Sequence, residues 1–136
     1  MEKKLTIPAK TEELHKVQAF VRAFLEDVDV SVKASTQLDI IVEEIFVNIA
    51  YYAYAPNEGN ATIMVDFVDD GRISITFSDT GIPYNPLANE DPDVTLSATE
   101  RRIGGLGIFM TKKFAEELHY EYKDGANVLT IVKALS

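Results

Sequence analysis

The sequence predicts a single α+β domain, a two-layer sandwich in which a mixed, mostly antiparallel sheet is covered on one face by helices. The elements follow the order strand, two helices, two strands, long loop, helix, two strands. The strands alternate apolar and polar residues across hairpin turn signals, which is typical of antiparallel strands with one buried face. The central helix is apolar around most of its surface, so it is expected to pack beneath the sheet.

Length and composition bound the class of protein. A chain of 136 residues is long enough for one core, so residues 1–136 are expected to form one domain. A hydrophobic content of 46% excludes a disordered chain. No apolar run approaches the roughly 20 residues of a membrane span, and the N-terminus has no signal-peptide pattern. The absence of cysteine excludes disulfides and thiolate metal sites. These observations predict a cytoplasmic protein without a membrane partner.

The charge is strongly acidic. A formal net charge of −9 argues against direct nucleic-acid binding, which needs a basic surface. An acidic protein that holds a polyphosphate must offset the repulsion locally, with a metal ion or with oriented backbone dipoles.

The first half of the chain contains one strand and two helices. Residues 5–8 read as an edge strand that Pro8 ends. Thr11 is the expected N-cap of an amphipathic helix that runs to about Asp27. Residues 31–36 supply the start signals of the central helix, which is expected to end near residues 55–59, where proline and glycine stop it.

The second half contains four strands and one helix. Two strands flank the turn at residues 69–71, and a second hairpin turns at Asp124 and Gly125. Residues 79–103 show no sustained period, and a loop of this length is unusual unless it is a lid or a binding loop. The expected remaining elements are strands 62–67 and 73–78, a helix from Ile108 to Leu118 after the glycines at 104–107, and strands 121–123 and 128–134.

Glu44 and Asn48 interrupt the apolar central helix one turn apart, on the same face. A buried carboxylate and amide cost free energy unless a partner satisfies them, and that partner can be a ligand. The alternative is that both side chains lie at the helix edge and bond to nearby backbone. The helix alone does not decide between the two.

Two glycine-containing segments are candidate binding motifs. Asp79 follows a strand directly, and Gly81 lets a flat ring approach the backbone, although Asp-x-Gly is also ordinary turn chemistry. The glycine-rich segment at residues 104–107 precedes a helix, and the free N–H groups at the start of a helix favour anions. The segment is neither a phosphate loop, because no lysine follows, nor a dinucleotide fingerprint, because no strand precedes it.

Taken together, these segments resemble the Bergerat-fold (GHKL) ATPases. Residues 44–48 look like the N box of that superfamily, residues 79–83 its first glycine box and residues 104–107 its second. The whole chain is similar to the small anti-sigma-factor serine/threonine kinases, the RsbW-like group, and the resemblance includes residues 7–9, 84–86 and the ending at 132–135. The fold that the resemblance implies is the histidine-kinase-like ATPase fold.

The resemblance implies a site for ATP and Mg²⁺. Asn48 would ligate the Mg²⁺ that bridges the phosphates, Glu44 would act as the catalytic base, and Asp79 would accept from the adenine amine. Arg102 is a candidate phosphate contact, although an arginine on a lid is more often solvated. The ATP-binding residues implied are Asn48, Tyr52, Asp79, Gly81, Pro83, Gly104, Gly105, Leu106, Gly107 and Ile108.

Three residues depart from the pattern of the group. Tyr52 stands where histidine is common, Asn85 where aspartate is common, and Asn127 where a threonine near the adenine is usual. The implied partners are a sigma factor and a STAS-like anti-sigma-factor antagonist that the protein phosphorylates, and a homodimer is left open. The departures favour a rival hypothesis, a non-catalytic switch whose ATP state selects the partner. The carboxylate of Glu44 beside Asn48 favours the kinase.

Overall fold

The computed structural model describes residues 2–54, 57–88 and 108–136. Its helices and strands follow the order that the sequence predicts. They are β1 (Lys3–Pro8), the 3-10 turn η1 (Thr11–Glu13), α1 (Leu14–Phe24), α2 (Val32–Tyr52), β2 (Asn60–Asp69), β3 (Arg72–Asp79), η2 (Pro86–Ala88), α3 (Phe109–Phe114), β4 (Glu117–Lys123) and β5 (Ala126–Ala134).

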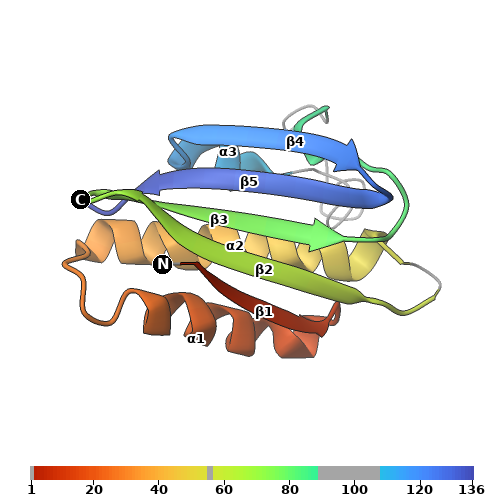
Figure 1. Cartoon of the computed structure of the whole chain (residues 1–136), viewed down its shortest axis with the longest axis horizontal. Coiled ribbons are helices and arrows are strands. Elements are labelled where there is room, and N and C mark those ends of the chain that lie inside the picture. The colour runs from red at the N-terminus through yellow and green to blue at the C-terminus, as the bar shows by residue number, and fades with distance from the viewer. Residues whose placement is uncertain (1, 55–56, 89–107) are drawn as a thin grey trace, which may run out of the picture.

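The strands form one sheet in the order β1-β2-β3-β5-β4. All four pairings are antiparallel, so the described residues form a simpler sheet than the mixed one expected. The helices lie together on one face of the sheet (Figure 1). Because β5 lies between β3 and β4, the last residue of β3, Asp79, is placed opposite Asn127 at the start of β5.

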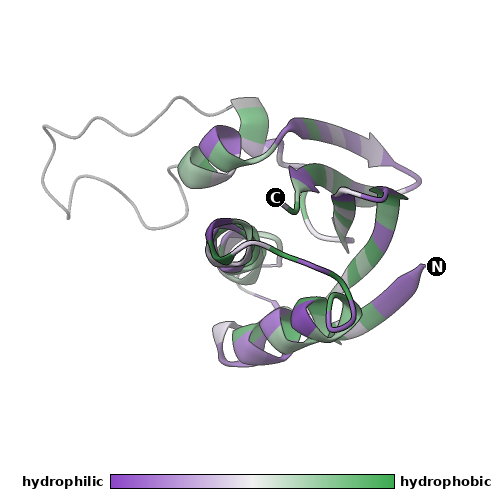
Figure 2. Ribbon diagram, turned by 90° about the vertical axis from the view of Figure 1, so that its left-hand side faces the viewer, coloured by the Kyte–Doolittle hydropathy of each residue, from purple (hydrophilic) through white to green (hydrophobic). Residues whose placement is uncertain are grey.

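The hydrophobic core fills the space between the sheet and α2. Seen end-on in Figure 2, α2 lies between the curved sheet, α1 and α3. Ile41, Ile45 and Phe46 of α2 are buried against the alternate residues of β3, such as Ile75 and Phe77. The strand period of two and the helix period of 3.6 therefore direct their apolar residues into one core, as the sequence predicts.

The ends of two helices differ from the expectation. The first helix begins at Leu14 after a separate 3-10 turn, and Thr11 does not cap it. The last helix ends at Phe114, and Leu118 belongs to β4, which begins four residues earlier than expected. The apolar residues at 114, 115 and 118 are compatible with either period, so the helical pattern was extended too far.

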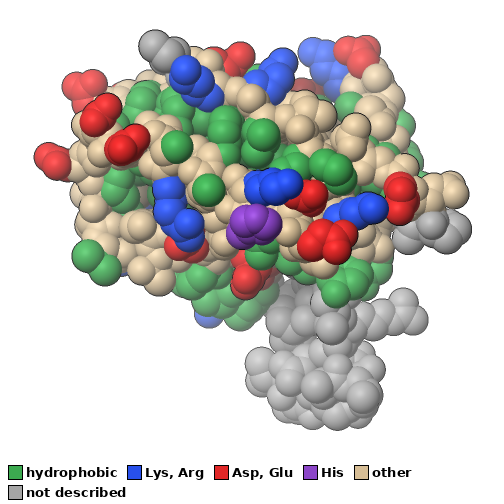
Figure 3. Space-filling model, turned by 90° about the horizontal axis from the view of Figure 1, so that it is seen from below, with side chains coloured by type: hydrophobic (Ala, Val, Ile, Leu, Met, Phe, Trp, Pro, Cys, Tyr) green, Lys and Arg blue, Asp and Glu red, His purple; other side chains and the backbone are tan. Residues whose placement is uncertain are grey.

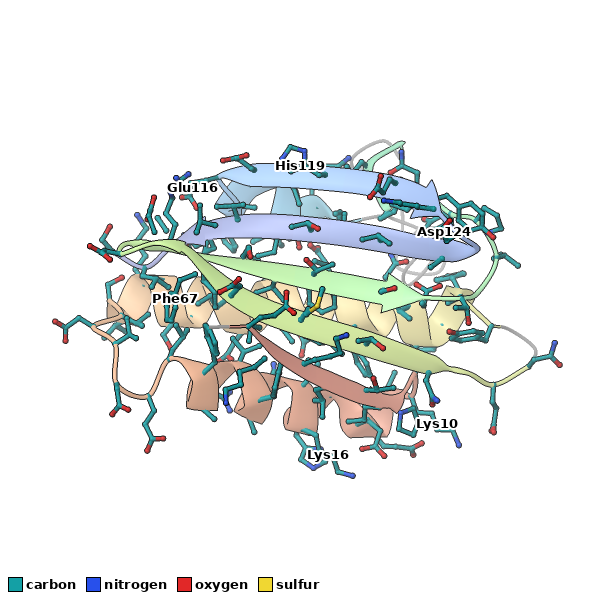
Figure 4. The ribbon with its side chains drawn as sticks, in the orientation of Figure 1. Lys10, Lys16, Phe67, Glu116, His119 and Asp124 are labelled. Carbon is teal, nitrogen blue, oxygen red and sulfur yellow. The ribbon has the colours of Figure 1, made fainter. Side chains whose placement is uncertain are left out.

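Several local signals were correct. The Ser31 hydroxyl accepts a hydrogen bond from the Ala34 amide (3.0 Å) and so caps α2. Asp124 and Gly125 both have positive φ angles, as the tightest hairpin turns require. Figure 4 shows Asp124 at this turn and His119 on β4, where its side chain is exposed.

The surface carries charges of both signs. On the face that contains α1, acidic and basic side chains are interspersed (Figure 3). None of the helices in the described part of the chain is long and apolar enough to cross a membrane.

Candidate functional site

A pocket opens between α2 and the sheet, where the C-terminal end of α2 meets the end of β3, the end of β4 and the start of β5. These four ends lie together at the right of Figure 1. The pocket is mostly apolar and aromatic, and Asp79 is the only charged side chain among its described lining residues. The lining consists of Ile45, Asn48, Ile49, Tyr52, Ala53, Phe77, Asp79, Ile82, Tyr84, Pro86, Ile108, Tyr120, Asn127 and Leu129.

Asp79 is buried at the end of β3, with 6% of its surface exposed. Its Oδ1 atom accepts hydrogen bonds from the Gly81 amide (3.0 Å) and from Nδ2 of Asn127 (2.9 Å). Burial raises the pKa of the Asp79 carboxyl, and these two hydrogen bonds oppose the rise only in part. Within the described residues no hydrogen bond reaches Oδ2, so this oxygen is available to a ligand amine.

Asn127 connects three segments around Asp79. Its Nδ2 atom also donates to the carbonyl oxygen of Ile82 (2.8 Å), and its Oδ1 accepts from the Tyr84 amide (3.0 Å). The Tyr120 hydroxyl of β4 donates to the same Oδ1. Burial raises the pKa of this hydroxyl, so Tyr120 is protonated and able to donate at neutral pH. The segment after β3 is therefore tied to β4 and β5 at the wall of the pocket.

Gly81 is required by a close approach of the backbone. A Cβ atom at this position would lie 2.0 Å from the carbonyl oxygen of Ala53, at the end of α2. The neighbouring Ile82 amide donates to that same oxygen (2.9 Å). The sequence predicts that a flat ring approaches this glycine, whereas in the structure the end of α2 approaches it. Because Gly81 is not among the described lining residues of the pocket, the approach of a ring to it stays a prediction.

Replacing Gly81 by alanine should therefore destabilise the protein. The added methyl group forces the end of α2 away from the segment after β3, and such overpacking costs about 1–3 kcal/mol or more. The measurement is the free energy of unfolding in urea. Gly71→Ala is the matched control, because a Cβ at Gly71 would meet no atom closer than 4.0 Å. Equal stability of the two variants would contradict this explanation.

Glu44 and Asn48 of α2 lie in two different environments. Asn48 is buried and lines the pocket one turn before Tyr52. Glu44 is half-buried and does not line the pocket. Its Oε1 accepts from the Thr111 amide and the Thr111 hydroxyl, both at 2.7 Å, and its Oε2 accepts from the Met110 amide (2.9 Å). Glu44 thus satisfies free N–H groups in the first turn of α3.

The two alternatives that the sequence left open apply to different residues. Asn48 faces the pocket, whereas the Glu44 carboxylate is bonded to nearby backbone. Hydrogen bonds of catalytic groups in ligand-free structures often rearrange when the substrate binds. The catalytic base at Glu44 remains a prediction.

The other predicted site residues have varied positions. Tyr52 and Ile108 line the pocket, and the ring of Tyr52 stacks at 6.4 Å from that of Tyr84. Pro83 is exposed, and neither it nor Gly81 is among the described lining residues. The following predicted residues lie outside the described part of the chain: Arg102, Gly104, Gly105, Leu106 and Gly107.

Sequence reasoning missed Tyr84, Tyr120 and the contacts of Asn127. Leu118 and Tyr120 occupy alternate positions of β4 and pack against the core, and that alternation was the available signal. Because the strand was expected to begin only at Glu121, Tyr120 was not assigned to it. Asn127 was noted as an unusual residue, but its partners lie far away in the sequence.

Known proteins resemble the chain over nearly all its length. The family described as "Histidine kinase-like ATPase domain" matches residues 7–133. An anti-sigma F factor of Clostridium perfringens is 25% identical over 134 residues, which cover 98% of this chain and 96% of the relative. The serine-protein kinase RsbW of Listeria monocytogenes is 24% identical over 129 residues, which cover 92% and 82% of the two chains.

Solved structures share the fold. The structure of the RsbU and RsbW domains of a Mycobacterium tuberculosis protein superimposes with a TM-score of 0.68 at 14% identity, over 99% of this chain and 32% of that one. A mycobacterial sensor histidine kinase, MprB, gives 0.54 at 18% identity, over 96% and 97%. The match of the family over residues 7–133 agrees with the α+β architecture described above, and the chain therefore belongs to the family of histidine kinase-like ATPase domains.

Proposed function

We propose that this protein binds Mg·ATP in the pocket and acts as an anti-sigma factor that phosphorylates a serine of its antagonist. The observation that carries the nucleotide site is Asp79, a buried carboxylate that lines a mostly apolar and aromatic pocket and whose Oδ2 accepts no hydrogen bond from the described residues. A pocket of this kind suits a flat, uncharged ring with one amine that needs an acceptor. The names of the relatives in Clostridium and Listeria support the role in sigma-factor control.

The donor set fits a magnesium ion that is held mainly by the nucleotide. Among the described residues no cluster of three or more histidine, aspartate or glutamate side chains could hold a metal by itself. Mg²⁺ usually binds through one or two protein ligands, substrate phosphates and water. Asn48 lines the pocket, so its amide oxygen is the candidate ligand. The ion would neutralise phosphate charge in a protein with a net charge of −9.

Asn48→Ala should weaken binding of Mg·ATP much more than binding of adenosine, because adenosine carries no phosphates for the ion to bridge. The loss of one ligand contact to a charged group is worth about 1.5–3 kcal/mol, or roughly 10- to 150-fold in affinity. Calorimetric titration of both ligands, with and without Mg²⁺, measures the two effects. Equal losses for adenosine and Mg·ATP would remove Asn48 from the metal site.

A second candidate function is a non-catalytic switch that binds ATP and holds a partner without transferring phosphate. The observation that favours it is the Glu44 carboxylate, whose two oxygens accept three hydrogen bonds from Met110 and Thr111. Both oxygens are therefore engaged by the first turn of α3 and not by a substrate. Three of its roughly four lone-pair sites are occupied, so a serine hydroxyl in the kinase must use the remaining site on Oε2 or displace one of these bonds.

The two functions differ in the fate of the captured partner. The full chain is used to capture proteins from a bacterial lysate, with and without Mg·ATP, and the captured proteins are analysed for phosphoserine. Phosphoserine that appears only with Mg·ATP supports the kinase. Partner capture that depends on ATP without phosphoserine supports the switch. Capture that is independent of ATP and yields no phosphoserine contradicts both.

A further inference from the structure

The hydrogen bonds of Asn127 use its side chain completely. An amide side chain can donate two hydrogen bonds from Nδ2 and accept two at Oδ1. Nδ2 donates to Asp79 and Ile82, and Oδ1 accepts from Tyr84 and Tyr120. All four hydrogen bonds that the side chain can make are therefore formed inside the wall of the pocket. A buried polar network stabilises a single conformation when every donor and acceptor in it is paired.

The orientation of this amide is dictated by its surroundings. Exchanging its nitrogen and oxygen would place Oδ1 2.9 Å from Oδ1 of Asp79 and 2.8 Å from the Ile82 carbonyl, with no proton between acceptors. The nitrogen would then face the Tyr84 N–H, a second donor. Only the observed orientation pairs every donor with an acceptor, so Asn127 always presents a donor to Asp79.

The consequence lies in the two oxygens of Asp79. Oδ1 is occupied by the Gly81 amide and by Asn127, whereas no described residue donates to Oδ2. Carboxylates rotate readily when only one donor holds them, and a rotated carboxylate presents its oxygens in a different direction. Asn127 supplies the second donor and also ties down Ile82 and Tyr84, which line the same pocket.

We propose that Asn127 is the positioning residue that sets purine specificity, because it fixes Oδ1 of Asp79 and leaves Oδ2 as the single acceptor for the exocyclic amine of a 6-aminopurine. This inference rests on the proposed nucleotide site and goes beyond it. A purine with a carbonyl at the same position would bring an acceptor against Oδ2 and is rejected. A threonine at position 127 has one donor only, so it cannot hold both Asp79 and Ile82.

The test compares ATP with inosine triphosphate, which differs in carrying a carbonyl in place of the amine. The affinities of both nucleotides, each with Mg²⁺, are measured by calorimetry for the wild type, Asn127→Thr and Thr130→Ala. Thr130 is the matched control on the same strand, because its hydroxyl bonds to that of Thr76 (3.1 Å) and is not part of the pocket. Thermal unfolding confirms that each variant is folded.

The expected result is a change in the ratio of the two affinities. The wild type and Thr130→Ala should prefer ATP by about 10- to 150-fold, the value of one charge-assisted hydrogen bond. Asn127→Thr should lose about fivefold or more of this preference. A role limited to holding the fold would weaken both nucleotides equally and leave the ratio unchanged, and that outcome would overturn the inference while the proposed function stands. A wild type that binds neither nucleotide would overturn the proposed function itself.

A measurement on the wild type decides the matter if Asn127→Thr does not fold. The side-chain amide protons of Asn127 are observed by nitrogen-15 NMR in the complex with Mg·ATP. Because both protons are hydrogen-bonded, to Asp79 and to Ile82, they should exchange slowly with solvent. Rapid exchange of both in the ATP complex would show that Asn127 releases Asp79, and would overturn the inference.

Discussion

Glu44→Gln should keep ATP binding and lose phosphorylation of the antagonist. Glutamine preserves the size of the side chain but removes the charge that orients or deprotonates a serine hydroxyl. A positioned base contributes about 10²–10⁴-fold to the rate. The measurement is the rate of phosphoserine formation on the antagonist that the capture experiment identifies, together with the affinity for Mg·ATP. Equal rates for wild type and Glu44→Gln would refute the assignment of the base.

Glu44 also holds the first turn of α3, so the experiment needs a control that separates this structural role from a role as the base. A glutamine has one acceptor oxygen, so one of the donors from Met110 or Thr111 would lose its partner in the variant. Thr111→Val removes one donor from the same cluster while the Glu44 carboxylate remains. If loosening of α3 causes the loss of rate, Thr111→Val should show a comparable loss. If the carboxylate is the base, Thr111→Val should keep most of the rate.

Asp79→Asn should lose most of the affinity for ATP. The variant replaces Oδ2, the acceptor available to the adenine amine, with an amide nitrogen, while its oxygen can still accept from Gly81 and Asn127. One lost charge-assisted hydrogen bond is worth about 1.5–3 kcal/mol, or roughly 10- to 150-fold in affinity. Calorimetric titration with Mg·ATP measures the change, and an unchanged affinity would show that Asp79 does not contact the adenine.

The same variant should be at least as stable as the wild type at neutral pH. Burial raises the pKa of Asp79 in the folded protein. The favourable contribution of such a group is complete below its unfolded pKa and is lost as the pH rises through the folded pKa. At pH 7 the charged Asp79 therefore costs stability, and the neutral asparagine removes that cost. Functional residues often lower the stability of the folded protein, so replacing them can raise stability while activity is lost.

The fold could be predicted because its signals are local. Alternation in β2 and β3, the turn at Asp124 and the helix-start signals at residues 31–36 each depend on neighbouring residues, and each was correct. The border between α3 and β4 was misplaced because a short apolar run fits both periods.

The candidate site could be predicted only in part. Asn48 was found because it interrupts an apolar helical pattern, and Asp79 because it follows a strand directly and precedes Gly81 by two residues; both line the pocket. The network that surrounds Asp79 could not be found in this way. Asn127 is 48 residues away from Asp79, and only the insertion of β5 beside β3 brings the two together. The bonding of Glu44 to α3 likewise joins residues that are 66 and 67 positions apart.

The central claim is that the pocket recognises adenine through Asp79. The most direct test is titration of the wild-type protein with Mg·ATP and with Mg·GTP under identical conditions. Guanine presents a carbonyl where adenine presents its amine, so the carboxylate should favour ATP by about 10- to 150-fold. A clear preference for ATP is the result that this structure predicts. Equal affinity for the two nucleotides, or binding of neither, would contradict it.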